Sequence, residues 1–379
     1  MERHIVVNAQ LLSLDSTYRA AGVSRYIYNL VGCLHDADPT SRYTALVGEH
    51  VQGWRGIGQQ ISRMPTNQPL VRVLWEQTRL PSHLRSLHAD LLHAPVNVAP
   101  LQSVCPTVVT VHDLSFIYYP DSFRAFQRLY QRTMTPISIG RAARIIAVSE
   151  NTRMDLLRLC RADPARVQVV YNGVEGRFRP IDKPEVEEFR RRRGLPEHMI
   201  LFVGTLEPRK NVSTLLKAYA LLRKTGRTKV PLVIAGGKGW FYSPIFALAE
   251  ELGLGEHLLF PGYIADAELP LWYNAAEIFV FPSLYEGFGL TPLEAMACGT
   301  PVIVSSASSL PEVVGDAGLI VEPQDVEGLA EAIAQLLDDP ALRKELGAAG
   351  RRRAREFTWP KTAQKTASVY RQALGEESN

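Results

Sequence analysis

Two glutamates flank a glycine-rich turn in the second half of the chain. The segment Phe281–Thr300 reads FPSLYEGFGLTPLEAMACGT, with Glu286 and Glu294 on either side of the turn GFG. An apolar run precedes the turn and a proline-containing helix start follows it, which predicts a buried strand joined to a helix. Helix-start N–H groups can bind a phosphate, and a carboxylate can accept hydrogen bonds from sugar hydroxyls. We therefore expect a ligand site here; a plain βαβ connection with a capped helix is the alternative.

Two adjacent cations form a second candidate site. Arg209 and Lys210 follow a strand-like run that ends at Gly204. The loop leaves the carboxyl end of a strand, which is where open α/β sheets bind ligands. A guanidinium that can form two parallel hydrogen bonds, beside a compact ammonium, suits a diphosphate group. A solvent-exposed basic turn is the alternative interpretation.

The first half of the chain contains two weaker candidates. Gly22 lies between the first strand-like run and a helical segment, so that its backbone could approach a phosphate. His112 ends the apolar run that begins at Thr107. A residue at the end of a strand in an α/β domain is well placed for function. The alternative for His112 is a buried, hydrogen-bonded histidine with a structural role.

Several other classes of site are not indicated. Neither G-x-G-x-x-G nor G-x-x-x-x-G-K-[ST] occurs, which disfavours a dehydrogenase and a P-loop protein. The four cysteines are far apart and form no C-x-x-C pair, so we expect neither a zinc site nor a disulfide framework. We expect no metal ligands and no cofactor.

Length and composition indicate an ordinary globular protein. The 379 residues suffice for about two domains, and 46% of them are hydrophobic and 21% charged. The net charge of +3 argues against a dedicated nucleic-acid binder. No apolar run approaches the ~20 residues of a membrane span, and no basic leader precedes the first strand-like run. We expect a cytoplasmic protein in a reducing compartment.

Twelve apolar runs alternate with helical segments along the chain. They are continuous rather than alternating, which is typical of parallel strands covered on both faces. Repeated βα units predict an α/β fold with doubly wound sheets, and two sets of runs predict two such sheets rather than one barrel. The runs cover residues 4–9, 43–47, 90–93, 107–112, 144–148 and 167–171, then 199–203, 231–235, 257–260, 278–281, 301–304 and 318–321.

Turn and breaker residues between 172 and 196 predict the junction of the two halves, with the linker near Pro180–Pro196. The arginine run 190–193 within it is interpreted as a solvated helix face, with an anion site as the alternative. The end of the chain predicts a helix over residues 358–373 with an apolar face.

Together these segments resemble the retaining glycosyltransferases of family 4, which belong to the glycosyl transferases group 1. The resemblance covers almost the whole chain and is strongest from Phe202 to Pro323. It rests on the E-x7-E pattern of Glu286 and Glu294 and on the segments GTLEPRKN (204–211), YNGV (171–174) and PGYI (261–264).

The resemblance implies the GT-B fold, in which two Rossmann-like doubly wound parallel-sheet domains face a central cleft. The N-terminal domain, residues 1–180, would bind the acceptor. The C-terminal domain, residues 181–356, would bind the nucleotide sugar. Residues 357–379 would form a helix that crosses back to the N-terminal domain.

The resemblance also implies roles for single residues. Arg209 and Lys210 would neutralise the donor diphosphate, Glu294 would hold the ribose hydroxyls, and His112 would sit beside the reacting sugar. Glu286 would contact the transferred sugar. The implied catalytic residues are therefore His112, Glu286, Arg209 and Lys210. The other implied donor contacts, many of them through the backbone, are Gly22, Gly204, Tyr263, Ile264, Gly287, Phe288, Gly289 and Leu290.

The function implied is transfer of a hexose from a nucleotide diphosphate sugar, GDP-mannose or UDP-glucose, to a hydroxyl of a glycan or lipid-linked acceptor. Retention at the anomeric carbon and no metal requirement are expected, in polysaccharide or glycoconjugate synthesis. The alternatives are a sugar-nucleotide epimerase or hydrolase on the same fold, and a non-catalytic sugar-nucleotide-binding protein.

Three positions depart from the family pattern. Many relatives have two glycines where this chain has Ala21-Gly22, and many have glycine at the position of Asn211, a residue that can also adopt the left-handed conformation. The segment Ser305–Ser309 lacks a glycine often found there.

The aromatic and basic segment Phe123–Arg132 could lie on an anionic membrane surface, which would make the protein membrane-associated. The alternative for this segment is a helix with one core face and one solvated face.

Overall fold

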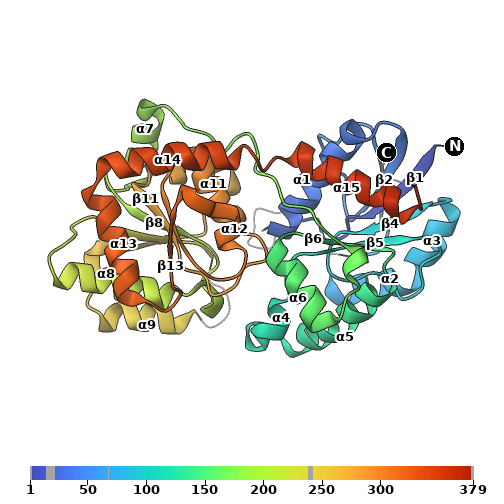
Figure 1. Ribbon diagram of the computed structural model, residues 1–379, viewed down its shortest axis with the longest axis horizontal. Helices are drawn as coiled ribbons and strands as arrows, with labels where there is room; N and C mark the ends of the chain where they lie inside the picture. The colour runs from blue at the N-terminus through green and yellow to red at the C-terminus, as the bar shows by residue number, and fades with distance from the viewer. Residues whose placement is uncertain (1, 14–21, 67, 238–241, 377–379) are drawn as a thin grey trace. The chain divides into compact units, whose positions relative to one another are not determined.

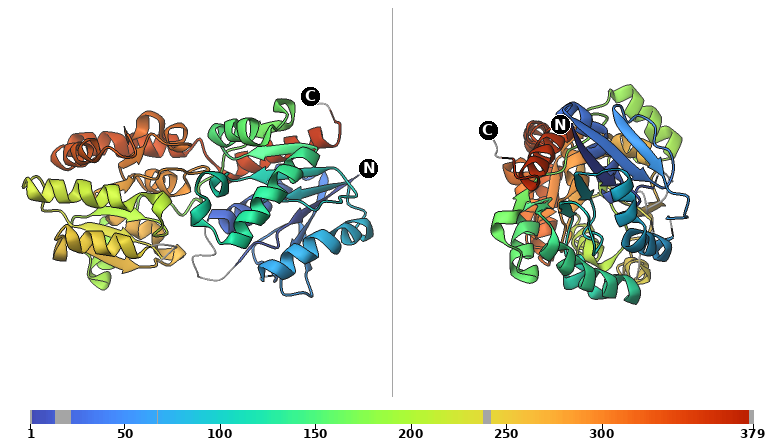
Figure 2. Two further views of the ribbon diagram at one scale, coloured as in Figure 1. Left: turned by 90° about the horizontal axis from the view of Figure 1, so that it is seen from below. Right: turned by 90° about the vertical axis from the view of Figure 1, so that its right-hand side faces the viewer.

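The computed structural model describes residues 2–13, 22–66, 68–237 and 242–376. The chain divides into two compact units (Figure 1). The first contains the chain up to Gly173 together with everything from Thr358 onward, and the second is Val174–Phe357. In each unit a parallel sheet has helices on both faces (Figure 2). This confirms the predicted fold class of two doubly wound α/β sheets.

The first unit has, within its described part, seven parallel strands in the order β3-β2-β1-β4-β5-β6-β7. The strands are β1 (Arg3–Asn8), β2 (Ser41–Val47), β3 (Ile57–Ile61), β4 (Leu91–Ala94), β5 (Thr107–Val111), β6 (Arg144–Ala147) and β7 (Val167–Val169). Its helices are α1 (Gly22–Ala37), α2 (Pro69–Thr78), α3 (Leu80–Ser86), α4 (Ser115–Tyr118), α5 (Ala125–Arg141), α6 (Glu150–Cys160) and α15 (Trp359–Ala373).

The second unit has, within its described part, six parallel strands in the order β10-β9-β8-β11-β12-β13. The strands are β8 (Ile200–Val203), β9 (Leu232–Ala235), β10 (Leu258–Gly262), β11 (Ile278–Phe281), β12 (Val302–Ser305) and β13 (Leu319–Val321). Its helices are α7 (Lys183–Arg193), α8 (Val212–Lys224), α9 (Ser243–Glu251), α10 (Leu269–Ala275), α11 (Leu290–Cys298), α12 (Leu310–Val314), α13 (Val326–Asp338) and α14 (Pro340–Ala354).

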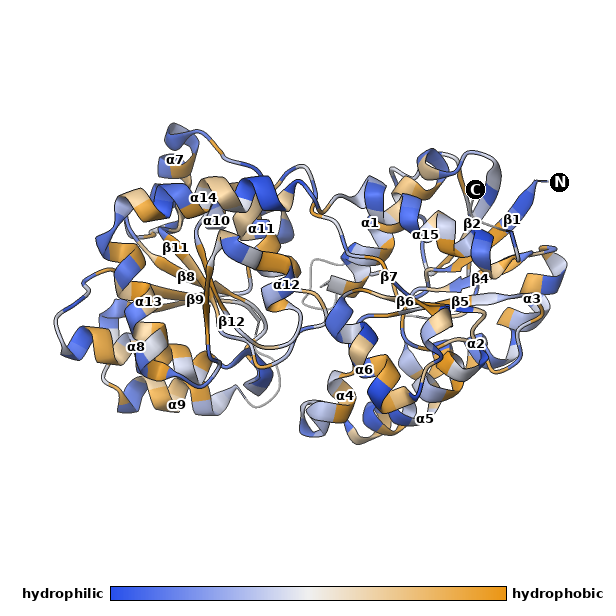
Figure 3. Cartoon of the chain, viewed as in Figure 1, coloured by the Kyte–Doolittle hydropathy of each residue, from blue (hydrophilic) through white to orange (hydrophobic). Residues whose placement is uncertain are grey.

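The continuous apolar runs form the centres of both sheets. Every residue of β9 and β11 is buried, and the inner strands of the second unit are mostly orange in Figure 3. Each of the twelve runs coincides with a strand. The strand that the sequence did not indicate is β3, whose sequence IGQQI is polar and partly exposed because it lies at the edge of its sheet.

The strand order creates a topological switch point in each sheet. In both units the chain starts at an inner strand, β1 or β8, and adds the next two strands on one side of it. It then crosses back and adds the remaining strands on the other side. At such a switch point the connections from two neighbouring strands leave in opposite directions, and ligands bind outside the carboxyl ends of these strands. In the second unit the two strands are β8 and β11, paired with Ile200 opposite Ile278.

The boundary between the units lies earlier than the predicted residue 180. The chain leaves the first unit after Gly173, and the Val174 N–H donates to the Phe357 carbonyl at 3.0 Å within the second unit. The segment expected to be a linker instead contains α7, because Val186 and Phe189 give it a buried face that packs on α10. Its arginine run lies in the last turn of this helix, where Arg191 and Arg193 pair with Glu188 and Glu268.

The C-terminal helix α15 belongs to the first unit. It begins at the cap residue Thr358 and packs along α1. Its buried apolar face includes Ala363, Ala367 and Val369, and the Thr362 hydroxyl donates to the Tyr171 carbonyl at 2.8 Å. In the described part of the chain, no helix has both the length and the hydrophobicity that crossing a bilayer would require.

Candidate functional site

The switch point of the second sheet brings the two charged segments of the sequence together. The loop after β8 contains a short 3-10 turn over Pro208–Lys210, and the loop after β11 contains the glutamate turn. The two loops are joined directly, since the Leu284 N–H donates to the Arg209 carbonyl at 2.8 Å. Residues 76 positions apart in sequence, such as Lys210 and Glu286, therefore share one site.

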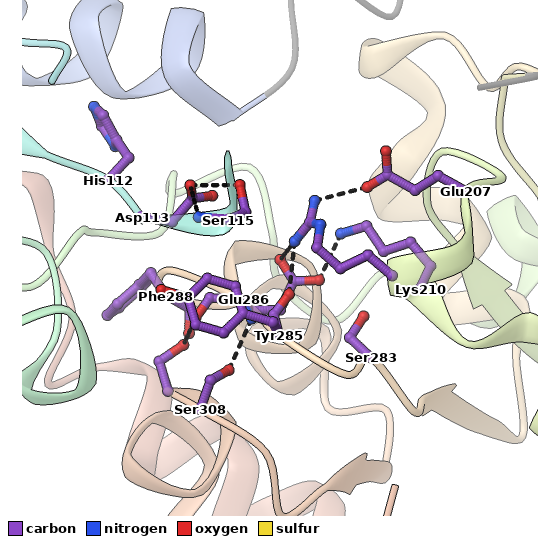
Figure 4. Close-up of polar contacts among 12 residues, drawn as sticks. His112, Asp113, Ser115, Glu207, Lys210, Ser283, Tyr285, Glu286, Phe288 and Ser308 are labelled. Carbon is purple, nitrogen blue, oxygen red and sulfur yellow. Dashed lines mark hydrogen bonds and ion pairs between the residues drawn. The ribbon is translucent and has the colours of Figure 1, made fainter. Parts of the chain in front are cut away.

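Four charged side chains form the centre of this site (Figure 4). Lys210 Nζ lies 2.6 Å from Glu286 Oε1, and Arg209 Nη1 lies 3.2 Å from Glu286 Oε2. Arg209 also binds Glu207 Oε1 at 2.7 Å through Nη2 and the Tyr285 carbonyl at 2.6 Å through Nη1. Two cations thus face two carboxylates, and the Lys210 ammonium has more N–H groups than its ion pair with Glu286 uses. The cluster can therefore bind an anion while its internal ion pairs persist.

The electrostatics of the cluster keep Glu286 ionised. Burial opposes ionisation, but the charges of Lys210 and then Arg209 outweigh it and lower the pKa of Glu286 to about 2. A carboxyl with this pKa is not a proton donor at neutral pH. Its chemical capacity is to accept hydrogen bonds and to hold the two cations in place.

The lowered pKa predicts that Glu286 stabilises the fold in a pH-dependent way. The depressed pKa means that its contribution is present above its ordinary pKa of 4.5 and is lost as the pH falls from 4.5 towards 2. The contribution is of the order of 3 kcal/mol. In urea unfolding, Glu286→Gln should be clearly less stable than the wild type at pH 7, and the gap should shrink below pH 4.5. A gap independent of pH would contradict this origin; comparison with the variant cancels the titration of buried histidines.

Serine hydroxyls hold the glutamate turn in shape. Ser308 Oγ accepts a hydrogen bond from the Glu286 N–H at 2.7 Å, and Ser309 Oγ donates to the carbonyls of Glu286 and Phe288 at 3.0 and 2.8 Å. Ser308 has a φ of 53°, the left-handed conformation that glycine usually takes. Ser308 therefore adopts the left-handed conformation without a glycine, and its hydroxyl makes a hydrogen bond that glycine cannot make.

The turn leads into α11 at a position that requires glycine. Gly289 is the helix N-cap with a φ of 107°, and a Cβ there would lie 2.9 Å from Leu310 Cδ2. Leu290 begins the helix, so the first N–H groups of α11 face the same loop that holds Glu286. Gly287 and Phe288 are buried between these points.

Asn211 adopts the left-handed conformation that the sequence suggested. Its φ is 56°, and its side-chain Nδ2 donates to the carbonyls of Pro282 and Pro323 at 3.0 and 2.5 Å. Its Oδ1 accepts from the Thr214 hydroxyl at 2.8 Å. Asn211 thus fixes the basic loop to the loop after β11, a contact that glycine could not make.

Gly236 is a residue of this site that the sequence analysis overlooked. It follows β9 with a φ of 151°, and a Cβ on it would lie 1.8 Å from the carbonyl oxygen of Gly204. The strand ends are linked around it: Gly204 N–H donates to Ala235 at 3.0 Å, and Gly236 N–H donates to Gly262 at 2.8 Å. The sequence signal was a single glycine directly after a strand-like run, at Gly236 as at Gly204. A glycine in such a position often marks a place where two backbones approach closely.

The other side chains expected to contact the donor in this unit lie on α11 and after β10. Glu294 is 2% exposed in α11 and accepts a hydrogen bond from the Tyr273 hydroxyl at 3.0 Å. Tyr263 and Ile264 follow β10, with Tyr263 half exposed and Ile264 buried. The contact from Tyr273 could not be predicted, because α10 and α11 are joined only by tertiary packing.

The candidates in the first half lie in the other unit. Gly22 is exposed and begins α1, whereas Ala20 and Ala21 lie outside the described residues. His112 follows β5 at the carboxyl edge of the first sheet. Its neighbour Asp113 is engaged elsewhere, because its Oδ1 accepts from the N–H and hydroxyl of Ser115 at 3.0 and 2.7 Å at the start of α4 (Figure 4).

The state of the His112 ring follows from its surroundings. Burial lowers its pKa, so the ring is neutral near pH 7. Its Nε2 lies 2.8 Å from the Pro95 carbonyl, which can only accept a hydrogen bond. Nε2 therefore carries the proton, and Nδ1 carries a lone pair. His112 can accept a hydrogen bond from a hydroxyl through Nδ1 but is not a cation.

A series of buried, hydrogen-bonded side chains packs against the His112 ring. The Tyr26 ring meets it edge-on with centroids 4.6 Å apart, and Tyr26 Oη lies 3.1 Å from Thr110 Oγ1. Thr110 is 2.8 Å from His93 Nε2, and His93 Nδ1 is 2.7 Å from the Tyr370 hydroxyl of α15. Burial lowers the pKa of His93 to about 3, so His93 is neutral and this series of side chains carries no charge.

The residues described form no group of three or more His, Cys, Asp or Glu side chains with the arrangement of a metal site. The charged cluster of the second unit is composed of ion pairs between carboxylates and cations.

Two family models match the chain, one in each half. Residues 185–353 match the family described as Glycosyl transferases group 1, and residues 20–176 match the family described as Glycosyltransferase Family 4. The first match contains the charged cluster, and the second contains His112.

Similar curated proteins include two mannosyltransferases. O-antigen chain mannosyltransferase B of Escherichia coli is 36% identical over 265 residues, which are 70% of this chain and 70% of that protein. Serotype-specific mannosyltransferase WbdA of Escherichia coli is 32% identical over 289 residues, 73% of this chain but 34% of that protein. A D-inositol 3-phosphate glycosyltransferase of Streptomyces bingchenggensis is 38% identical over 248 residues, 62% of this chain and 54% of that protein. The chain thus matches only a part of the last two.

Solved structures share the fold over nearly the whole chain. Sucrose-phosphate synthase of Thermosynechococcus elongatus has a TM-score of 0.78 and 26% sequence identity, covering 99% of this chain and 100% of that one. HepE of Anabaena, solved in complex with UDP-glucose, has a TM-score of 0.75 at 18% identity, covering 98% and 100%.

Proposed function

We propose, since this chain belongs to the group 1 glycosyltransferases of the GT-B fold, that it transfers a mannosyl group from GDP-mannose to a hydroxyl of a glycan or lipid-linked acceptor. The observation that carries the proposal is the cluster of Arg209, Lys210 and Glu286 at the switch point of the second sheet. This is where an α/β sheet binds a nucleotide, and the two cations suit its diphosphate.

The choice of mannose rests on the relatives. Two of the most similar curated proteins are mannosyltransferases, and the first of them is matched over 70% of its own length. UDP-glucose is the second candidate donor, because the structurally similar HepE was solved with it. The site itself favours neither base, since the expected base contacts at Tyr263 and Ile264 use the backbone.

In the proposed mechanism the residues of the cluster stabilise the leaving group. As the bond between sugar and diphosphate breaks, negative charge grows on the phosphate, and the sugar becomes an oxocarbenium-like cation. Lys210, Arg209 and the start of α11 would offset the growing negative charge. The acceptor hydroxyl would attack from the face of the departing phosphate and give its proton to that phosphate, which retains the anomeric configuration.

Glu286 has a supporting part in this mechanism. Its pKa of about 2 and its two ion pairs make it a poor nucleophile and a poor acid, so we assign it to orientation of the two cations and of a sugar hydroxyl. Glu294 is assigned to the ribose, and neutral His112 to a sugar hydroxyl through Nδ1.

Donor identity can be tested by thermal unfolding with GDP, UDP and ADP and their sugars. We expect GDP and GDP-mannose to raise Tm and the other nucleotides to leave it unchanged, because a ligand that binds only the folded state stabilises it. Stabilisation by UDP alone would overturn the choice of donor.

Transfer assayed by NMR should give an α-mannoside from the α-linked donor; an inverted product would overturn the mechanism.

The phosphate contacts proposed here come from side chains and backbone, so excess EDTA should leave transfer unchanged. Loss of activity in EDTA, restored by Mg²⁺ or Mn²⁺, would contradict a metal-independent reaction.

The transfer assay also distinguishes the alternative functions. Hydrolysis of the donor in the presence of all offered acceptors would indicate a hydrolase. Binding of the donor without turnover would indicate a sensor.

A further inference from the structure

Asn97 lies in the loop after β4 with an unusual backbone conformation. Its φ is 37°, and the residue is only 7% exposed. The Val98 N–H donates to the Val96 carbonyl across Asn97, which is the hydrogen bond of a γ-turn. A positive φ at the central residue belongs to the rare, strained form of this turn. A buried residue other than glycine costs free energy in such a conformation, so its surroundings must hold it there.

The side chain of Asn97 holds the main chain of His112 and Asp113. Its Oδ1 accepts a hydrogen bond from the His112 N–H at 3.0 Å, and its Nδ2 donates to the Asp113 carbonyl at 3.3 Å. These partners determine which end of the amide is oxygen, since an N–H can only donate and a carbonyl can only accept. The main-chain N–H of Asn97 donates to the Thr110 carbonyl at 2.8 Å. The loop after β4 is therefore tied to residues 110, 112 and 113, where β5 ends.

The same loop also binds the His112 ring. The Pro95 carbonyl, two residues before Asn97, accepts the hydrogen bond from His112 Nε2 at 2.8 Å. His112 is thus held to this loop both by its ring and by its main chain. Because Nε2 is occupied, Nδ1 is the ring nitrogen that can accept a hydrogen bond from a ligand. A displacement of the loop would move the Pro95 carbonyl and release the ring.

Asparagine is the residue type that meets all of these requirements at position 97. Glycine adopts a positive φ at little cost but has no side chain to bind the main chain of β5. Aspartate tolerates a positive φ as well, but it has no donor for the Asp113 carbonyl. Alanine would be strained and would make neither hydrogen bond. A backbone requirement and a side-chain requirement therefore coincide at a residue that the proposed mechanism does not use.

We propose that Asn97 is a positioning residue that fixes the His112 ring, so that Nδ1 is available to a hydroxyl of the reacting sugar. In this assignment Asn97 does not touch the substrate; it acts through the main chain of His112 and through the Pro95 carbonyl. Strained residues that are held in place by their neighbours are typical of preorganised sites. The part of His112 in the reaction rests on the proposed function, whereas its fixation by Asn97 does not.

The test compares the full chain with Asn97→Gly, which allows the turn and removes both side-chain hydrogen bonds. We expect kcat for transfer to fall by about tenfold or more, because a displaced catalytic group is costly. The KM for the donor should change little, because the cations proposed to bind the diphosphate belong to the charged cluster of the second unit.

The second readout is the Nε2 proton of His112, observed by proton NMR without substrate. In the wild type this proton should exchange slowly with water, because it is bonded to the Pro95 carbonyl. In Asn97→Gly it should exchange rapidly or disappear from the spectrum.

Two further variants complete the experiment. Asn97→Asp keeps an acceptor for the His112 N–H, so it should lie between the wild type and Asn97→Gly in kcat and in proton exchange. The matched control is Arg161→Gly, which places glycine at another positive φ of the first unit, 51° at the end of α6. It should leave both readouts as they are in the wild type.

An unchanged kcat or an unchanged exchange of the Nε2 proton in folded Asn97→Gly would overturn the proposal. If Asn97→Gly did not fold, wild-type values of both readouts in Asn97→Asp would overturn it instead. Equal losses in Arg161→Gly would also do so, because they would show a general effect of the substitution. A wild type that transfers no sugar would count against the proposed function alone, since the proton exchange is measured without turnover.

Discussion

Replacing Lys210 with alanine is expected to lower kcat by about 10²–10³-fold with a much smaller effect on folding. The ammonium lies 2.6 Å from Glu286 and 4.9 Å from the centre of the Phe281 ring, so its position is fixed before any ligand arrives. A cation fixed in this way stabilises the leaving group without reorganising during the reaction. The measurement is steady-state transfer by the wild type and the variant, with Tm recorded for both.

The control for this experiment is Lys217→Ala on the exposed face of α8, a few residues further along the chain. It removes the same charge from the same unit and should leave kcat unchanged. A double-mutant cycle of Lys210→Ala with Glu286→Gln then separates two roles of the lysine. Strong non-additivity in kcat means that the two residues act as one unit, whereas additive losses would contradict their coupling through the observed ion pair. Wild-type turnover in both single variants would refute the assignment of this site.

Replacing Gly236 with alanine is expected to lower the free energy of unfolding of the second unit by about 3–5 kcal/mol. The new Cβ would lie 1.8 Å from the Gly204 carbonyl oxygen, a backbone atom that cannot rotate away, and the φ of 151° is itself unfavourable for alanine. The ends of β8 and β9 would have to separate. Because the basic loop starts at Gly204, donor binding should weaken as well.

Gly226→Ala separates the two causes. Gly226 also has a positive φ, 70°, but a Cβ added to it would have no other atom within 4 Å, so the substitution there adds conformational strain without a collision. We expect it to cost about 1 kcal/mol in urea unfolding and to leave donor binding intact. Equal losses in the two variants would show that strain, and not the approach of the two strand ends, makes glycine necessary at residue 236.

The fold could be predicted from sequence because its strands are buried on both faces. Strands such as β9 and β11 appear as unbroken apolar runs, and their order along the chain predicts two doubly wound sheets. The same reasoning fails for β3, which lies at a sheet edge and has no need of apolar residues on both faces. The unit boundary was misplaced because Pro180 and the turn residues around it suggested a linker where hydrogen bonds tie the chain to the second unit.

For the site, the sequence could indicate which residues carry charge but not which of them form ion pairs with one another. The proximity of Arg209, Lys210 and Glu286 follows from the pairing of β8 with β11, which no local pattern encodes. The contacts of Ser308 and Ser309 with the glutamate turn arise from β12 lying beside β11. Hydroxyl groups are too common along a chain for such a role to be predicted from residue type.

The return of α15 to the first unit has a consequence for how the protein is made. Its side chains Trp359, Val369 and Tyr370 share a core with α1 and β1, yet the whole of Val174–Phe357 is translated between Gly173 and this helix. At roughly 5–20 residues per second, a ribosome needs on the order of ten to forty seconds to cross that gap. During this time the nascent first unit exposes the apolar surface that α15 will cover, while the second unit can already complete its own core. The unit synthesised first is therefore the last to be finished.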